Sequence, residues 1–263
     1  MKTILSLGAG VQSSTIALMA AHGEVGPMPD CAIFADTQAE PQTTYDYLDR
    51  LIPLLPYPVH RVTAGDLREA VINPHRGFMP VPFRLKREDG TEGLTRRQCT
   101  REYKITPVTK KVRSLIGMTG KKIKKGLPLV EMWMGISLDE IQRMKENRDH
   151  WITNRFPLIE ERMTRGHCME WLQSKGYEVP PKSACTFCPY HGNEQWRYLR
   201  DNDADAWQDA VDVDAAIRGN TRNATGEMFV HRDLIPLPQA DLSTAEDHGQ
   251  LSFLDECEGM CGV

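Results

Sequence analysis

The stretch Thr3-Ile-Leu-Ser-Leu-Gly-Ala-Gly-Val-Gln-Ser-Ser14 contains the pattern on which the fold prediction depends. The residues before Gly8 alternate and begin with β-branched side chains, and an apolar run of helical length covers residues 11–21. This order predicts a strand, a tight glycine turn and a helix. Because a glycine turn that opens a helix presents backbone N–H groups, the same stretch is a candidate anion-binding loop.

Similar units follow along the amino-terminal half of the chain. Further strands are predicted at residues 31–35, 59–62 and 129–136. Helices are predicted at residues 41–51 and from Ser137 to about Asn147, where Ser-Leu-Asp-Glu has the form of a capping box. Strands that alternate with helices indicate a mostly parallel sheet covered on both faces. We therefore expect a doubly wound, Rossmann-like α/β fold.

The carboxyl-terminal half of the chain has a different pattern. Residues 73–98 contain several prolines and glycines without clear periodicity, which predicts a long loop. After residue 150, the best helical candidates are residues 166–175, 193–200 and 204–218. The predicted organisation is an α/β nucleotide-binding domain, a helical portion and an acidic tail, at residues 1–150, 151–235 and 236–263 respectively.

The composition restricts the class of protein. Hydrophobic residues make up 40% and charged residues 26% of the 263 residues, which are ordinary values for a soluble globular protein. The sequence contains neither a signal peptide nor an apolar run long enough for a membrane helix. We therefore expect a cytoplasmic protein without a membrane partner. In that compartment, we do not expect the seven cysteines to form a disulfide framework, and the closely spaced ones are better explained as metal ligands or redox groups.

A basic segment interrupts a chain whose net charge is −4. Its cationic residues are Arg96, Arg97, Arg101, Lys104, Lys110, Lys111, Arg113, Lys121, Lys122, Lys124 and Lys125. Such a segment is typical either of a solvated face or of a surface that contacts phosphates. The sequence leaves both interpretations open.

The glycine loop is the predicted site for the phosphates of a nucleotide. Its candidate residues are Ser6, Gly8, Ala9, Gly10, Val11, Gln12, Ser13 and Ser14. The loop is not a Walker loop, because the Gly-Lys-Ser ending is absent. Asp36, Thr37 and Glu40 follow the second predicted strand, and ligands of α/β sheets bind at the carboxyl ends of strands. We expect these three side chains to hold the sugar or base.

These motifs together resemble the PP-loop ATP pyrophosphatase superfamily, and within it the phosphoadenosine phosphosulfate reductase-like proteins. The loop at residues 8–13 is similar to the family's Ser-Gly-Gly-x-Asp-Ser, from which Gly8, Ala9 and Gln12 depart. Residues 36–43 resemble the family's Asp-Thr-Gly-x-Glu motif. Two later segments also resemble family motifs, at residues 135–143 and 156–159.

This resemblance runs from about residue 2 to residue 200 and implies a function. The implied ligands are ATP or another adenine nucleotide and Mg²⁺, with Gly135 as a further nucleotide-binding residue. Lys104 and Arg143 are the residues expected to stabilise the phosphates during catalysis. Gln12 replaces the family's aspartate, so ATP cleavage itself stays open.

The cysteines form a second candidate site. Cys185-Thr-Phe-Cys188 has the spacing that zinc and iron-sulfur sites use, because both thiolates can reach one metal centre. Cys257 and Cys261 form a second pair. Cys99 lies in a segment that resembles the family's Cys-Cys-x-x-x-Lys-x-x-Pro motif, which implies that it joins Cys185 and Cys188 in a four-iron cluster. The tail pair are candidates either for further ligands or for catalytic thiols.

Other residues near these motifs have simpler interpretations. For the metal itself we favour a [4Fe–4S] cluster over zinc. A tetrahedral zinc site would be complete with the four thiolates of the two cysteine pairs alone. Cys31 and Cys168 occupy apolar strand and helix positions and are expected to be core residues. His191 is expected to form a local hydrogen bond, and the five tryptophans are expected in the core.

Three hypotheses follow. The leading one is an enzyme that adenylates a substrate, releases pyrophosphate and transfers sulfur from a donor to a nucleic acid or nucleoside. The second is the reduction of an adenylyl sulfate, with Cys257 or Cys261 as the nucleophile. The third is a non-catalytic protein that binds a nucleotide or nucleic acid and is stabilised by zinc. A homodimer is compatible with each.

Overall fold

A five-stranded parallel sheet forms the centre of the molecule. The computed structural model describes residues 1–73, 75, 78–219, 226–244, 246–247 and 249. The strands are β1 (Lys2–Leu7), β2 (Cys31–Asp36), β3 (Val59–Thr63), β6 (Val130–Trp133) and β7 (Ile152–Arg155). Their order is β3-β2-β1-β6-β7, and each neighbouring pair is parallel. The predicted α/β fold is confirmed.

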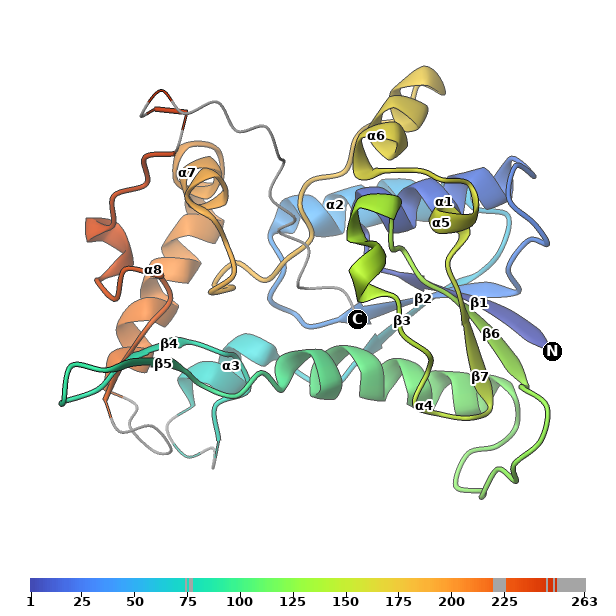
Figure 1. Cartoon of the computed structure of the whole chain (residues 1–263), viewed down its shortest axis with the longest axis horizontal. Helices are drawn as coiled ribbons and strands as arrows, with labels where there is room; N and C mark the ends of the chain where they lie inside the picture. The colour runs from blue at the N-terminus through green and yellow to red at the C-terminus, as the bar shows by residue number, and fades with distance from the viewer. Residues whose placement is uncertain (74, 76–77, 220–225, 245, 248, 250–263) are drawn as a thin grey trace.

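Helices cover both faces of this sheet, as Figure 1 shows. On one face lie α1 (Val11–Ala21), α2 (Gln42–Leu51), α5 (Pro157–Glu160) and α6 (Arg165–Ser174). The other face is covered by α4 (Thr106–Leu115). Alternate side chains of β1 point to opposite faces of the sheet. Leu5 and Leu7 pack on the α1 side, and Ile4 packs on the α4 side.

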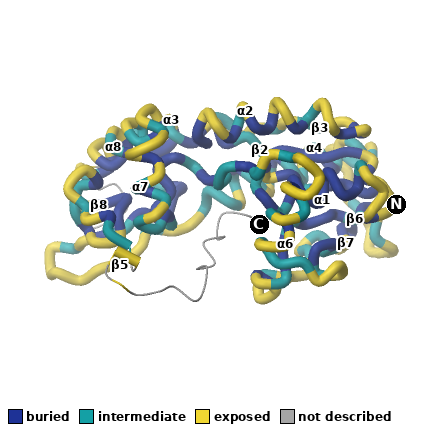
Figure 2. Tube along the Cα trace, turned by 90° about the horizontal axis from the view of Figure 1, so that it is seen from above, coloured by how far each residue is buried: buried dark blue, intermediate teal, exposed yellow. Residues whose placement is uncertain are grey.

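A second unit packs around a separate hydrophobic core. Its antiparallel sheet has the order β5-β4-β8 and consists of β4 (Arg84–Lys86), β5 (Glu92–Leu94) and β8 (Glu227–Phe229). Its helices are α3 (Leu67–Ile72), α7 (Asn193–Asn202) and α8 (Ala204–Arg218). Figure 2 shows the two units as separate buried centres along the long axis. The remaining short helices are η1 (Ile52–Leu54), η2 (Thr100–Ile105), η3 (Leu138–Arg143) and η4 (Leu237–Gln239).

Two predicted segments differ in the structure. Residues 73–98, predicted as a loop, contain the β4–β5 hairpin, which becomes regular only by pairing with the distant β8. The predicted boundary at residue 150 falls between β6 and β7, two strands of one sheet. Pairing partners far away in the sequence decide both features, so local periodicity does not reveal them.

The helix predicted from Ser137 to Asn147 was wrong. The structure contains only the short η3 there, and Ser137 forms no side-chain cap. The Ser137 hydroxyl instead lies 3.5 Å from Gln12 Nε2, and Glu140 pairs with Arg143 at 2.6 Å. Ser137 therefore contacts a residue of α1, and Glu140 pairs locally with the residue three positions further along η3. The short helix ends at Arg143.

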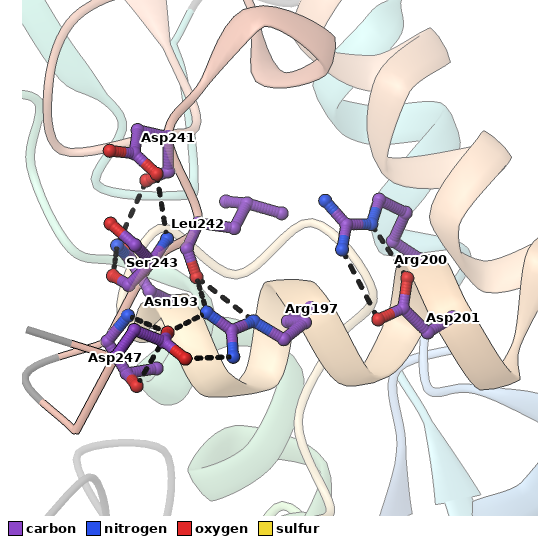
Figure 3. Close-up of polar contacts among 9 residues, drawn as sticks. Asn193, Arg197, Arg200, Asp201, Asp241, Leu242, Ser243 and Asp247 are labelled. Carbon is purple, nitrogen blue, oxygen red and sulfur yellow. Dashed lines mark hydrogen bonds and ion pairs between the residues drawn. The ribbon is translucent and has the colours of Figure 1, made fainter.

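Residues 241–243 and Asp247 are held against α7. Arg197 donates to the Leu242 carbonyl and pairs with Asp247, while Asn193 donates to the Asp241 and Ser243 carbonyls at 3.0 and 2.7 Å (Figure 3). The Arg197 guanidinium holds the pKa of the Asp247 carboxyl well below its usual range. These contacts hold residues 241–243 and Asp247 beside the helix that follows the Cys185–Cys188 turn.

No helix within the described ranges is long and apolar enough to cross a membrane.

Candidate functional site

The glycine loop lies at the point where the strand order reverses. The chain passes from β1 outward to β2 and β3, and later returns to place β6 on the other side of β1. In open α/β sheets, the carboxyl ends of the strands at such a switch point form the usual ligand crevice. Residues 8–10 follow β1 at this position, and Gly135 follows β6 beside them.

Gly135 supports the loop by its lack of a side chain. A Cβ at this position would lie 3.0 Å from Ser13 N and 3.1 Å from Ser13 Cα. The β6 end therefore packs directly on the first turn of α1, and a side chain would push that turn away. The structure thus gives Gly135 a positioning role next to the loop.

The first turn of α1 is open to an anion. Gly10 is the N-cap residue and supplies no side-chain cap, and the first turn contains no acidic residue. Ser13 Oγ accepts a hydrogen bond from Gly8 N at 3.0 Å and donates to the Gly10 carbonyl at 3.3 Å. The loop is therefore closed upon itself, while the positive end of the helix dipole remains without a carboxylate.

The predicted loop residues divide into two groups. Ala9, Val11, Ser13 and Ser14 are buried, and Ser14 is completely inaccessible. Gly8 is exposed, and Ser6, Gly10 and Gln12 are partly exposed. The backbone near Gly8 and Gly10 is therefore accessible, while Ser13 and Ser14 are enclosed in the turn.

Two residues in these loops have left-handed backbones without being glycine. Ala9 has a φ of 56° and Gln38 has a φ of 57°. Both stand where the similar family motifs have glycine. Because left-handed backbone is unfavourable for residues with a Cβ, the fold imposes these conformations on the loops at some cost in stability.

We expect Gln38→Gly to increase the free energy of unfolding by about 1 kcal/mol, because glycine adopts a positive φ without steric cost. The control is Gln208→Gly, within α8. Because glycine is unfavourable inside a helix, this change is expected to lower the free energy of unfolding by about 1 kcal/mol. Urea denaturation measures both. A destabilised Gln38→Gly protein would contradict the strain at this position.

The end of β2 provides polar groups beside the loop. Asp36 Oδ1 accepts hydrogen bonds from Gln38 N at 2.8 Å and from the Tyr45 hydroxyl at 2.9 Å. Burial and the bond to Asp36 raise the pKa of Tyr45 above its usual range. Thr37 and Glu40 are buried. Asp36 is thus held in place at the strand end, next to the loop that follows β1.

Glu40 connects the loop with the second candidate site. Ser183 Oγ donates to Glu40 Oε2 at 3.2 Å, and Lys104 Nζ lies 3.4 Å from Glu40 Oε1. Ser183 also packs beside Gly10, where a Cβ would lie 3.7 Å from the Ser183 Cβ. A continuous set of contacts therefore runs from Gly10 through the buried Glu40 to Lys104. Nothing in the sequence pattern singled out Ser183.

Three cysteines line one cavity at the far end of these contacts. The cavity is lined by Cys99, Cys185 and Cys188. The other residues that line it are Thr37, Leu67, Val81, Pro82, Arg97, Thr100, Lys104, Phe187 and Tyr190. Thr37 Oγ1 lies 3.6 Å from Cys185 Sγ. The fold thus brings together thiols that are separated by more than eighty residues in sequence, as the resemblance implied. The carboxyl end of β2 forms part of the wall.

His191 stabilises the Cys185–Cys188 turn. Its Nε2 lies 2.9 Å from the Cys185 carbonyl, which also accepts from Cys188 N at 3.0 Å. Burial lowers the pKa of His191 to about 3, so the ring is neutral and donates from Nε2. Its edge packs on Trp196 with ring centroids 4.6 Å apart. The expected local hydrogen bond is present.

The three thiols have the donor chemistry that zinc and iron-sulfur centres use. Within the described residues, however, no three Cys, His, Asp or Glu side chains are grouped closely enough to hold a metal ion as they stand. A centre on this cavity therefore requires the thiols to turn toward one another. Cys257 and Cys261, the other predicted ligands and catalytic candidates, lie outside the described residues.

The remaining cysteines are core residues, as predicted. Cys31 and Cys168 are buried, and burial raises the pKa of the Cys168 thiol to about 12. Three tryptophans are also fully buried, namely Trp133, Trp151 and Trp196. Trp171 and Trp207 are only partly buried, although both pack against core clusters.

Comparisons with known proteins find resemblance only at the level of structure. No family model matches the sequence, and no curated protein matches it. Among the solved structures that match is a phosphoadenylyl-sulfate reductase from Candida auris, determined as a phosphate complex. It shares 12% sequence identity with this chain and has a TM-score of 0.40. The match covers 68% of this chain and 75% of that protein.

Proposed function

We propose that the protein is an enzyme that binds an adenine nucleotide at the glycine loop and couples it to thiol chemistry at the cysteine cavity. The observation that carries this proposal is the set of contacts from Gly10 through Ser183 and Glu40 to Lys104. It joins an uncapped helix N-terminus at the switch point to a cavity lined by three cysteines. The helix N-terminus alone would support nucleotide binding, and the cavity alone would support thiol chemistry, but the proposed enzyme needs both.

The nucleotide phosphates would lie against the first turn of α1. Backbone N–H groups there and the helix dipole would bind the negative charge. Lys104 and Arg143 would add positive charge, and each is paired with a buried carboxylate, Glu40 or Glu140, that positions it. Mg²⁺ would arrive with the phosphates, because Mg²⁺ commonly binds through one or two carboxylates and substrate oxygens. Asp36, at the carboxyl end of β2, is the carboxylate that we propose for this role.

The proposed reaction has two steps. A substrate oxygen attacks the α-phosphorus of ATP, the bond to the β-phosphate oxygen breaks, and pyrophosphate leaves. Sulfur supplied by a donor at the oxidation level of hydrosulfide then attacks the activated carbon, and AMP leaves with the oxygen. The acceptor would be a nucleic acid or nucleoside.

Cys99, Cys185 and Cys188 would hold the iron-sulfur cluster of this proposal. When bound, a [4Fe–4S] cluster with three protein ligands would supply an open iron at which sulfur can be held. The chain's own part is to keep these thiols in one cavity and to seal it with Phe187 and Leu67, both fully buried. Zinc on the same thiols would leave a stabilised nucleotide-binding protein without this chemistry.

The first test is to purify the protein without oxygen and to measure iron, zinc and labile sulfide per chain. We expect about four irons and four sulfides per chain. In the same preparation, AMP and pyrophosphate are expected to form from ATP when RNA, DNA or nucleoside acceptors are added. Stoichiometric zinc without labile sulfide, and no AMP with any acceptor, would exclude the sulfur-transfer reaction.

A further inference from the structure

The basic segment begins at the cysteine cavity and leads away from it. Residues 96–125 contain eleven cationic side chains and a single carboxylate, Glu102. Arg97 and Lys104 line the cavity, and the chain continues through η2 and α4 to the connection before β6. Together η2 and α4 extend for about 24 Å at about 1.5 Å per residue. Figure 1 shows α4 running along the sheet from α3 toward this connection.

Most of these cations project into solvent. Tyr103, Pro107 and Val112 are buried, so one side of this helical stretch faces the core. The exposed cations, which we name the basic track, are Arg96, Arg97, Arg101, Lys110, Lys121, Lys122, Lys124 and Lys125. The sequence alone did not decide whether they share a surface. In the structure, Arg96 and Arg97 precede η2, Arg101 lies on η2 and Lys110 on α4. The other four, Lys121, Lys122, Lys124 and Lys125, lie in the connection that follows α4.

The basic track combines a high density of exposed cations with a lack of nearby carboxylates, because Glu102 is the single acidic residue among residues 96–125. Across the described part of the chain, no residue of the basic track forms an ion pair with a carboxylate. Some exposed cations elsewhere have such partners, as in Arg50–Glu178, Lys175–Glu24 and Arg200–Asp201, whereas isolated ones such as Lys145 and Arg162 form no ion pair with a described residue. The positive charge of the basic track is therefore available to an external polyanion, in a protein whose net charge is −4.

We propose that the basic track binds the phosphate backbone of a nucleic acid whose reacting base lies at the cysteine cavity. This inference rests on the proposed function and names its acceptor as a polynucleotide rather than a free nucleoside. A length of about 24 Å corresponds to about seven phosphates of one strand at about 3.4 Å each. Arginines and lysines in such a row bind phosphates without reading the base sequence, so they hold the strand in register with the cavity.

A nucleic acid fits these observations better than an anionic membrane. The basic track begins at a cavity with three thiols, continues through η2 and α4 and ends in the connection before β6, a route that a single strand can follow. A membrane-binding surface combines cations with a broad apolar face. Only Leu127 and Leu129 are exposed large apolar residues in the connection before β6. The membrane therefore serves as an alternative outcome of the test.

The test measures binding of a fluorescein-labelled RNA hairpin, and of DNA of the same sequence, to the full-length protein by fluorescence anisotropy. The variant is Lys121→Glu/Lys122→Glu, at the end of the basic track away from the cavity. We expect it to weaken binding about tenfold or more at physiological salt, and to reduce the slope of log Kd against log salt concentration by about two. The control is Arg200→Glu/Arg232→Glu, which changes charge equally on the second unit and is expected to bind within about twofold of wild type.

An unchanged Kd in the Lys121/Lys122 variant, or an equal loss in the control variant, would overturn the proposal. Binding to phosphatidylserine vesicles but to neither RNA nor DNA would overturn it as well. ATP affinity of each protein separates the two proposals. If ATP binds but nucleic-acid binding does not depend on the basic track, the basic track proposal fails alone. If ATP does not bind while the variant loses RNA, the proposed function fails and the basic track remains a nucleic-acid surface.

Discussion

Replacing Gly10 with aspartate is expected to weaken ATP binding about 100-fold or more, while α1 remains folded. Aspartate is among the best N-cap residues, so the change favours the helix itself. Its carboxylate would occupy the position where the phosphates bind, and two like charges about 4 Å apart near a protein surface repel by about 4 kcal/mol. Gly10 has an ordinary φ of −97° and room for a Cβ, so the backbone accepts the change.

The control is Gly10→Asn, which has the same shape and caps the helix without a charge. We expect asparagine to cost much less affinity than aspartate, and both proteins to unfold at or above the wild-type urea midpoint. Isothermal titration calorimetry with ATP measures the affinities. If the two variants lose affinity equally, side-chain size rather than phosphate charge is responsible. If neither loses affinity, the nucleotide does not bind at this loop.

The second large effect concerns the cysteine cavity. Cys185→Ser is expected to remove nearly all bound metal from protein purified without oxygen, because serine oxygen is a poor ligand for iron-sulfur clusters and zinc compared with thiolate. Cys99→Ser and Cys188→Ser are expected to behave in the same way, since the three thiols share one cavity. Metal analysis and visible absorption spectra measure this loss.

Cys31→Ala is the matched control for these variants. Cys31 is buried in β2 on the α4 side of the sheet and does not line the cavity. Its replacement is expected to lower stability modestly while metal content stays at the wild-type level. Full metal content in Cys185→Ser would show that the centre lies elsewhere. The same measurement on Cys257→Ser and Cys261→Ser tests whether the tail supplies a further ligand.

Much of the central sheet could be predicted because its signals are local. The β1 strand, the glycine turn and α1 are consecutive, and α1 was predicted at the bounds that the structure has. Buried parallel strands are short apolar runs, so β2 and β6 were also recognised. The edge strand β3, which is only partly buried, was recognised as a short segment between Val59 and Val62. The β4–β5 hairpin and the boundary within the sheet were missed, because they depend on pairing with β8 and β7.

In the candidate site, too, the features with local sequence signals could be predicted and those that depend on distant contacts could not. The motifs identified the glycine loop, Asp36, Glu40 and the Cys185–Cys188 turn, since each carries its chemistry in a few adjacent residues. Ser183 and Tyr45, which complete the contacts of Glu40 and Asp36, had no distinguishing pattern. Their roles arise from where neighbouring segments meet.

The sequence by itself thus determined the fold class and which residue types could bind a phosphate or a metal. Only the tertiary structure decided that Cys99 lines the same cavity as Cys185 and Cys188, that Gly135 packs on the first turn of α1, and that Ser14 is buried. The physical reason is that periodicity and turn chemistry act over a few residues. Cavities, packing distances and the direction of a basic helix depend on contacts between segments that are far apart in the chain.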